Sequence, residues 1–163
     1  MVSWMRFIMC LGITLLLSMI ALPEEIRVFR PPFVLLYALY FQFYSEKFFG
    51  VAGLFLLGLF VDVCSVSLLG EHAFALVFTA GYAASKRRRF ESASFTNQLL
   101  LIMWLCFIYQ LILQLIELII GSPQSWWSAP LTALMGAWFW PLICFWLGTG
   151  RTRLKRAQDF FGN

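Results

Sequence analysis

The sequence predicts an all-α integral membrane protein, a compact bundle of six transmembrane helices formed by one domain over residues 1–163. Hydrophobic residues make up 61% of the chain, where soluble domains reach about 45–50%. Charged residues make up only 12%. A domain of this size buries only about 70% of its surface, so this apolar excess cannot be hidden from water. The composition therefore excludes a disordered chain, a disulfide-stabilised secreted domain and an ordinary soluble enzyme.

Six apolar segments carry the prediction of helices, and they lie at about residues 7–22, 32–45, 48–70, 73–85, 97–121 and 130–148. A helix needs about 20 residues to cross a hydrocarbon core of about 30 Å, so the third, fifth and sixth segments are long enough. The second and fourth are shorter, and they could be short tilted spans or re-entrant segments. The first segment lacks a small-residue cleavage site, and we expect an uncleaved span there.

Basic residues predict the orientation of these spans. With both termini inside, ten of the twelve lysines and arginines lie on the inner side, as the positive-inside rule requires. The run Lys86-Arg87-Arg88-Arg89 contributes four of them. Such a run could also bind nucleic acid or acidic lipid, but an orientation signal is the better interpretation. We expect membrane lipids as neighbours and no nucleic-acid partner.

Motifs for catalysis and for metal or cofactor binding are absent from the sequence. The four cysteines are widely separated within apolar runs, and His72 is the only histidine. No phosphate-binding loop or nucleophile motif occurs. We therefore expect no enzyme activity, catalytic residue, cofactor or metal. His72 stands beside Glu71 between two segments, where a solvated turn is expected.

Asp62 is an acidic residue in the third apolar segment. An aspartate at the bilayer centre costs about 2.5–3.5 kcal/mol on insertion scales, so it needs a structural or functional reason. It could remain protonated, or it could pair with Ser65, Gln110 or Gln114. The spacing along the sequence does not decide between these alternatives. Gly58 precedes Asp62 by one helical turn, and such small residues let helices approach closely.

A polar stripe is predicted on the fifth segment. Gln110, Gln114 and Glu117 follow one another at helical spacing and share one face of that helix. A transport or proton pathway would explain such a stripe, and so would hydrogen bonding between helices or to a partner helix. Two carboxyl groups without an intramembrane cation make a poor cage for an anionic substrate, which favours the structural interpretation. Arg30, at the outer end of the second segment, reads as a flanking charge.

An ordered set of short motifs points to a known family. It consists of Phe29-Arg30-Pro31, Gly58-x-x-x-Asp62 with Leu69-Gly70, a basic inner loop, Glu117, Trp140-Pro141 and a basic tail. This set, from about Pro23 to Arg156, resembles the rod shape-determining protein MreD family.

The resemblance implies a non-enzymatic inner-membrane scaffold of the bacterial cell-elongation complex, which builds peptidoglycan and determines rod shape. Its direct partner would be MreC, linking MreB filaments to the RodA–transpeptidase synthase pair. Arg30, Asp62, Gln110, Gln114 and Glu117 would then bind a partner or shape the bundle. The family is similar in fold to the substrate-binding components of energy-coupling-factor vitamin transporters, which supplies the alternative function. The AxxxA pattern common in the first span of those components is missing here, and this favours the scaffold.

Overall fold

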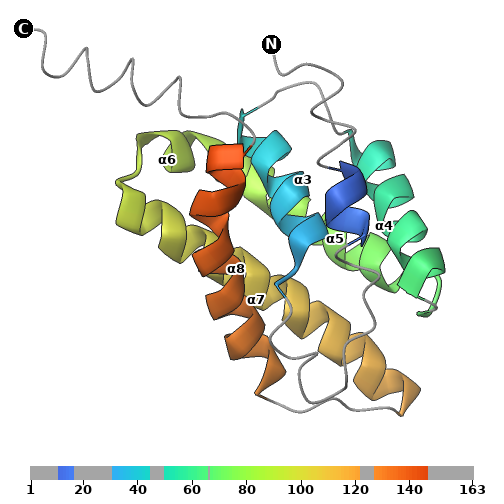
Figure 1. The fold of residues 1–163 in the computed structure, drawn as a ribbon. Helices are drawn as coiled ribbons and strands as arrows, with labels where there is room; N and C mark the ends of the chain where they lie inside the picture. Colours follow the sequence, from blue (N-terminus) through green and yellow to red (C-terminus); the bar gives the residue numbers. More distant parts are fainter. Residues whose placement is uncertain (1–10, 17–30, 45–49, 66, 122–126, 147–163) are drawn as a thin grey trace, which may run out of the picture.

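The described part of the chain is helical apart from its turns, which confirms the all-α class. A computed structural model describes residues 11–16, 31–44, 50–65, 67–121 and 127–146 (Figure 1). Residues 11–16 are a short helical stretch. The helices that follow are α3 (Phe33–Tyr44), α4 (Val51–Ser65), α5 (Glu71–Ser85), α6 (Arg87–Ser92), α7 (Phe95–Ile120) and α8 (Ser128–Trp146).

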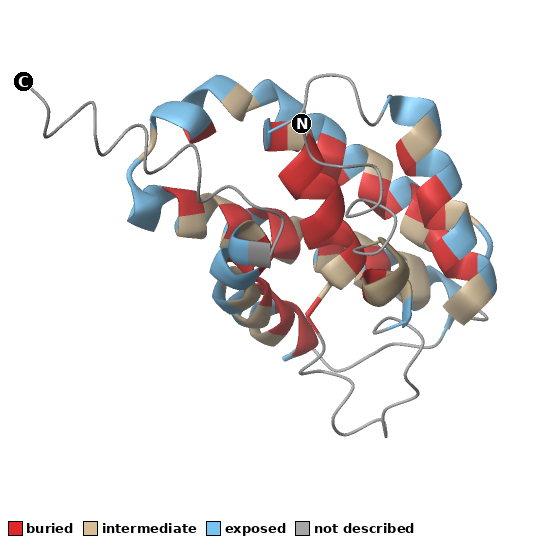
Figure 2. Ribbon diagram, turned by 45° about the horizontal axis from the view of Figure 1, so that its top comes forward, coloured by how far each residue is buried: buried red, intermediate tan, exposed pale blue. Residues whose placement is uncertain are grey.

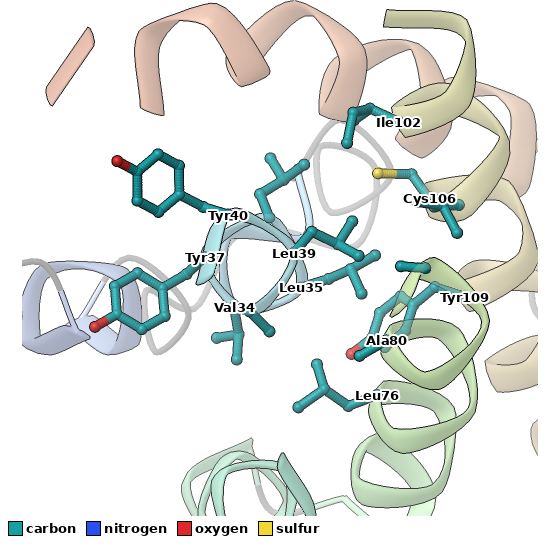
Figure 3. Close-up of a cluster of buried hydrophobic side chains, with 14 of the residues drawn as sticks. Val34, Leu35, Tyr37, Leu39, Tyr40, Leu76, Ala80, Ile102, Cys106 and Tyr109 are labelled. Carbon is teal, nitrogen blue, oxygen red and sulfur yellow. The ribbon is translucent and has the colours of Figure 1, made fainter. Parts of the chain in front are cut away.

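Helix α3 forms the centre of the molecule. Nine of its 12 residues are buried, which is expected for a helix that is apolar on every side. It contacts α5, α6 and α8, and Figure 2 shows it as the most continuously buried helix. In Figure 3, Leu35 and Leu39 point toward α7 at Cys106, while Val34 points toward Leu76 of α5. A continuous apolar core therefore surrounds α3.

Among the described helices the two longest are α7 and α8, with 26 and 19 residues. They are the described helices that are long and apolar enough to cross a membrane. Helices α3, α4 and α5 have 12, 15 and 15 residues, a rise of about 18–23 Å at 1.5 Å per residue. That rise is less than the hydrocarbon thickness of about 30 Å. The described helices therefore include two candidate spans, and six crossing helices are not confirmed.

The outer surface of the helices is strongly apolar. Ile119 is 84% exposed, Phe145 82% and Trp138 77%. Figure 2 shows exposed positions recurring along the outward faces of α4, α7 and α8. Soluble monomers rarely carry contiguous apolar surface on this scale, whereas a bilayer solvates it without cost. The surface is that of a protein surrounded by lipid.

The starts of several helices can be compared with the predicted segments. Helices α3, α7 and α8 start within two residues of the segments predicted at 32–45, 97–121 and 130–148, while the ends predicted at 45 and 148 lie outside the described residues. The third segment, predicted to continue to residue 70, ends as a helix at Ser65, and α5 begins at Glu71. The first segment is described only at residues 11–16, so the rest of that prediction lies outside the described residues.

Helices α7 and α8 approach each other closely at Gly136. A β-carbon there would lie 2.5 Å from the Cys106 sulfur, so only glycine fits without movement. The predicted role of small residues in close helix packing is met at this position.

Candidate functional site

The candidate site is the junction of α4 and α5, built around Asp62. This side chain is fully buried near the end of α4. Its Oδ2 accepts a hydrogen bond from the backbone N–H of Gly70 at 2.8 Å. Its Oδ1 accepts one from the backbone N–H of His72 at 2.9 Å. One carboxyl group thus holds two backbone donors at the start of the next helix.

Two side chains complete the environment of the same carboxyl group. Nδ1 of His72 lies 2.9 Å from Oδ1 of Asp62, so the imidazole in its Nδ1–H tautomer donates to this oxygen. The Ser67 hydroxyl donates to Oδ1 at 3.2 Å. Four donors therefore converge on the two oxygens of Asp62, an arrangement suited to a carboxylate because a carboxylate only accepts.

These contacts make Asp62 the N-terminal cap of α5. The first N–H groups of a helix have no partner within that helix, and a nearby negative charge also interacts favourably with the helix dipole. The residue at the cap position is Gly70, which has no side chain to accept these bonds. Its φ of +101° is a left-handed conformation that glycine adopts without strain. The missing cap is supplied by Asp62 from the preceding helix.

Gly58 belongs to the same unit. It lies one turn before Asp62 in α4 and therefore faces α5 with it. A β-carbon at Gly58 would stand 2.2 Å from the Ala73 Cα atom, a distance that no side chain can accept. The Gly58-x-x-x-Asp62 motif thus joins two functions, since glycine admits the backbone of α5 and aspartate caps it.

The partners of Asp62 differ from those expected. Asp62 pairs with Ser67, Gly70 and His72, whereas Ser65, Gln110 and Gln114 were the expected partners. Ser65 lies further along α4, and the two glutamines lie on α7. The observed partners lie in the turn after α4 and at the start of α5, and this part of the chain folds back against Asp62.

The expectation of a solvated turn for His72 is also corrected. His72 lies in the first turn of α5 with its side chain only 23% exposed, against Asp62. Its ring centroid is 6.4 Å from that of Tyr109 in α7, which ties the junction to a third helix. The signal available in the sequence was an aspartate near the end of one helix, followed eight residues later by Gly70 and ten residues later by His72 at the start of the next.

The polar stripe on α7 forms a separate contact. Gln110, Gln114 and Glu117 are all partly buried. The Gln114 amide donates a hydrogen bond to the hydroxyl of Ser128, the first residue of α8. This bond supports the expectation of hydrogen bonding between helices at Gln114. The structure does not bring the stripe to Asp62, and Arg30 lies outside the described residues.

The junction lacks the geometry of a hydrolytic site. In a serine hydrolase the aspartate and the serine bind opposite nitrogens of the histidine. Here Ser67 lies 3.4 Å from Nδ1 of His72, the nitrogen that also faces Asp62. The imidazole therefore cannot relay a proton from Ser67 toward Asp62. Within the described ranges, no three histidine, cysteine or acidic side chains are grouped to hold a metal ion.

Comparisons with known proteins match nearly the whole chain. The family model for rod shape-determining protein MreD matches residues 1–147. The rod shape-determining protein MreD of Haemophilus influenzae is 25% identical over 153 residues, which cover 94% of each chain. No solved structure matches this chain. The match is thus a property of the full helical chain and not of one short motif.

Proposed function

Because this chain belongs to the rod shape-determining protein MreD family, we propose that it is a non-enzymatic inner-membrane scaffold of the bacterial cell-elongation machinery. The observation that supports a scaffold most directly is the use of Asp62. Its oxygens receive four donors from the chain itself and its side chain is fully buried, so the carboxyl group organises helices and is closed to a substrate from outside. The family supplies the role in cell shape, and this geometry supports a structural means of performing it.

In this proposal the scaffold binds MreC directly. Through MreC it links MreB filaments on the inner side to the RodA–transpeptidase pair that synthesises peptidoglycan. A single-span partner needs an apolar helix face within the bilayer, and the outward faces of α4, α7 and α8 offer such surface. The family resemblance supports the choice of partner.

Both termini are proposed to be cytoplasmic. The distribution of ten of the twelve basic residues supports this orientation. In this arrangement the basic α6 faces the cytoplasm, and the Asp62 junction lies toward the outer half of the bilayer.

Affinity purification of the tagged chain from its own membranes in mild detergent tests this function. Mass spectrometry should identify MreC as the main co-purifying protein, with MreB and the synthase pair in smaller amounts. Co-purification of an ATPase pair and a coupling subunit without MreC would contradict the scaffold and indicate a vitamin transporter.

A pair of variants connects the Asp62 junction to this assembly. Asp62→Leu removes the cap of α5, and we expect loss of both MreC recovery and rod shape in complemented cells. Val63→Leu changes the adjacent, 63% exposed residue and should leave both unchanged. Normal MreC recovery and normal cell shape with Asp62→Leu would show that the junction is not needed for the scaffold.

A further inference from the structure

Helix α6 is a short basic helix held firmly at one end of the bundle. Its Phe90 is 1% exposed and stacks on Phe43 of α3, with ring centroids 3.9 Å apart and an interplanar angle of 8°. The Trp140 ring of α8 meets Phe90 edge-on at 5.9 Å. The Gln98 amide donates to the carbonyl oxygens of Phe90 and Ala93 at 3.1 and 3.2 Å. Figure 1 shows α6 beside the last turns of α8. The backbone of α6 is therefore fixed by three other helices.

Two of the four basic side chains at α6 have partners within the protein. The Lys86 ammonium lies over the Tyr82 ring at 5.6 Å from its centroid. The Arg87 guanidinium donates from Nε to Glu91 at 3.0 Å, one turn along the helix. These two positive charges are thus partly satisfied by neighbouring groups.

The other two basic side chains, Arg88 and Arg89, are exposed. Their guanidinium groups make no hydrogen bond or ion pair with the described residues. Arginine presents a planar set of donors that matches the oxygens of a phosphate group, often with two parallel bonds. Because Phe90 anchors the backbone next to them, these two groups are presented from a rigid support, and binding costs less conformational entropy.

An exposed aromatic stripe leads along α5 to this basic turn. Phe74, Phe78 and Tyr82 lie one helical turn apart and are 59%, 56% and 38% exposed. The first two rings stack with centroids 6.4 Å apart. The stripe covers about 12 Å of helix and ends where Lys86 lies over Tyr82. A charged headgroup at α6 would therefore stand next to an apolar track that can receive its acyl chain.

We propose that Arg88 and Arg89 bind the phosphate of an anionic phospholipid, with an acyl chain packed along Phe74, Phe78 and Tyr82. The two features together fit a lipid better than a free phosphate, which has no use for the aromatic stripe. This site lies apart from the Asp62 junction, so its failure would leave the proposed scaffold function untouched.

Native mass spectrometry of the purified full chain in a neutral detergent tests the site. The probes are phosphatidylglycerol, phosphatidylcholine and inorganic phosphate. Phosphatidylglycerol should bind more tightly than phosphatidylcholine, and an excess of inorganic phosphate should not displace it. The double variant Arg88→Gln/Arg89→Gln should weaken phosphatidylglycerol binding about thirty-fold, since each interfacial basic residue contributes about 1 kcal/mol.

A charge-matched control separates this site from the net charge of the protein. Arg151→Gln/Arg153→Gln removes two positive charges from the C-terminal tail, and it should leave the lipid preference intact. Arg88→Lys/Arg89→Lys preserves charge, and it should retain part of the affinity and confirm folding by its thermal transition. Equal binding of the two lipids by the unmodified protein, displacement by inorganic phosphate, or the same loss in the tail variant would each overturn the proposal.

Discussion

Replacing Asp62 by leucine tests the most specific feature of this structure, the cap of α5 supplied from α4. The change removes four hydrogen bonds and leaves the part-buried backbone N–H groups of Gly70 and His72 without their acceptor. A hydrogen bond to a charged group contributes about 1.5–3 kcal/mol, but such contributions overlap when one group makes them all. Removing one partner from a buried charged network costs about 3–5 kcal/mol in total. We therefore expect Asp62→Leu to lower the free energy of unfolding by about 3–5 kcal/mol.

Loss of helical circular dichroism on addition of sodium dodecyl sulfate to mixed micelles measures this effect. Asp62→Asn should have an unfolding midpoint between those of the unmodified protein and Asp62→Leu. The amide preserves the size of the side chain and one acceptor oxygen, but its NH₂ group replaces the second oxygen and faces a donor. Val63→Leu, on the lipid-facing side of the same turn, is the matched control and should unfold like the unmodified protein. A midpoint for Asp62→Leu equal to that of Val63→Leu would refute the capping role.

Three further changes test the contacts around this cap and across α7 and α8. Gly58→Ala should destabilise by about 1–3 kcal/mol, because the added methyl group overpacks against α5. Gly81→Ala is the control, and it should be neutral or slightly stabilising because open space surrounds its β-carbon. Equal unfolding midpoints for the two variants would contradict the close approach of α4 and α5. His72→Phe should lower the free energy of unfolding by about 1–3 kcal/mol, because the carboxylate loses the imidazole donor. His72→Asn should recover part of this stability, because its amide N–H can occupy the same place. An asparagine variant no more stable than the phenylalanine variant would argue against the hydrogen bond. A double-mutant cycle of Gln114→Leu and Ser128→Ala should show a coupling energy of about 0.6–1.7 kcal/mol between the two side chains. Additive effects of the two changes would mean that the hydrogen bond contributes nothing to stability.

The junction gives a physical reason for an acidic residue in an apolar helix. Insertion of Asp62 into a bilayer is costly, and that cost is offset when the carboxyl group receives donors that would themselves be unsatisfied. The start of α5 provides such donors, because its cap position is a glycine in a left-handed conformation. Two groups that are each unfavourable in lipid stabilise one another. A buried acid in an apolar helix can thus be a folding element, and transport is not needed to explain it.

The helical composition of the protein and the position of its longest helices follow from the sequence. Hydrophobicity acts locally and residue by residue, so runs such as the one within Phe95–Ile120 indicate a helix long and apolar enough to cross a membrane. The start of helix α3 lies one residue from the predicted one, because Pro32 precedes it and suits a helix start. The spacing of Gln110, Gln114 and Glu117 predicted a shared face, because a regular helix determines that by its own geometry.

Tertiary structure decided what these helices do with one another. The sequence does not indicate that α3, a helix of 12 residues, is the central one, because its burial depends on α5, α6 and α8 packing around it. Nor does it identify the partners of Asp62, since Gly70 and His72 come within reach only after α4 stops at Ser65 and the chain turns back. Spacing rules apply within one helix. A contact across a turn depends on the dihedral angles of the residues between, and here a single positive φ at Gly70 places the start of α5 on the carboxylate of Asp62.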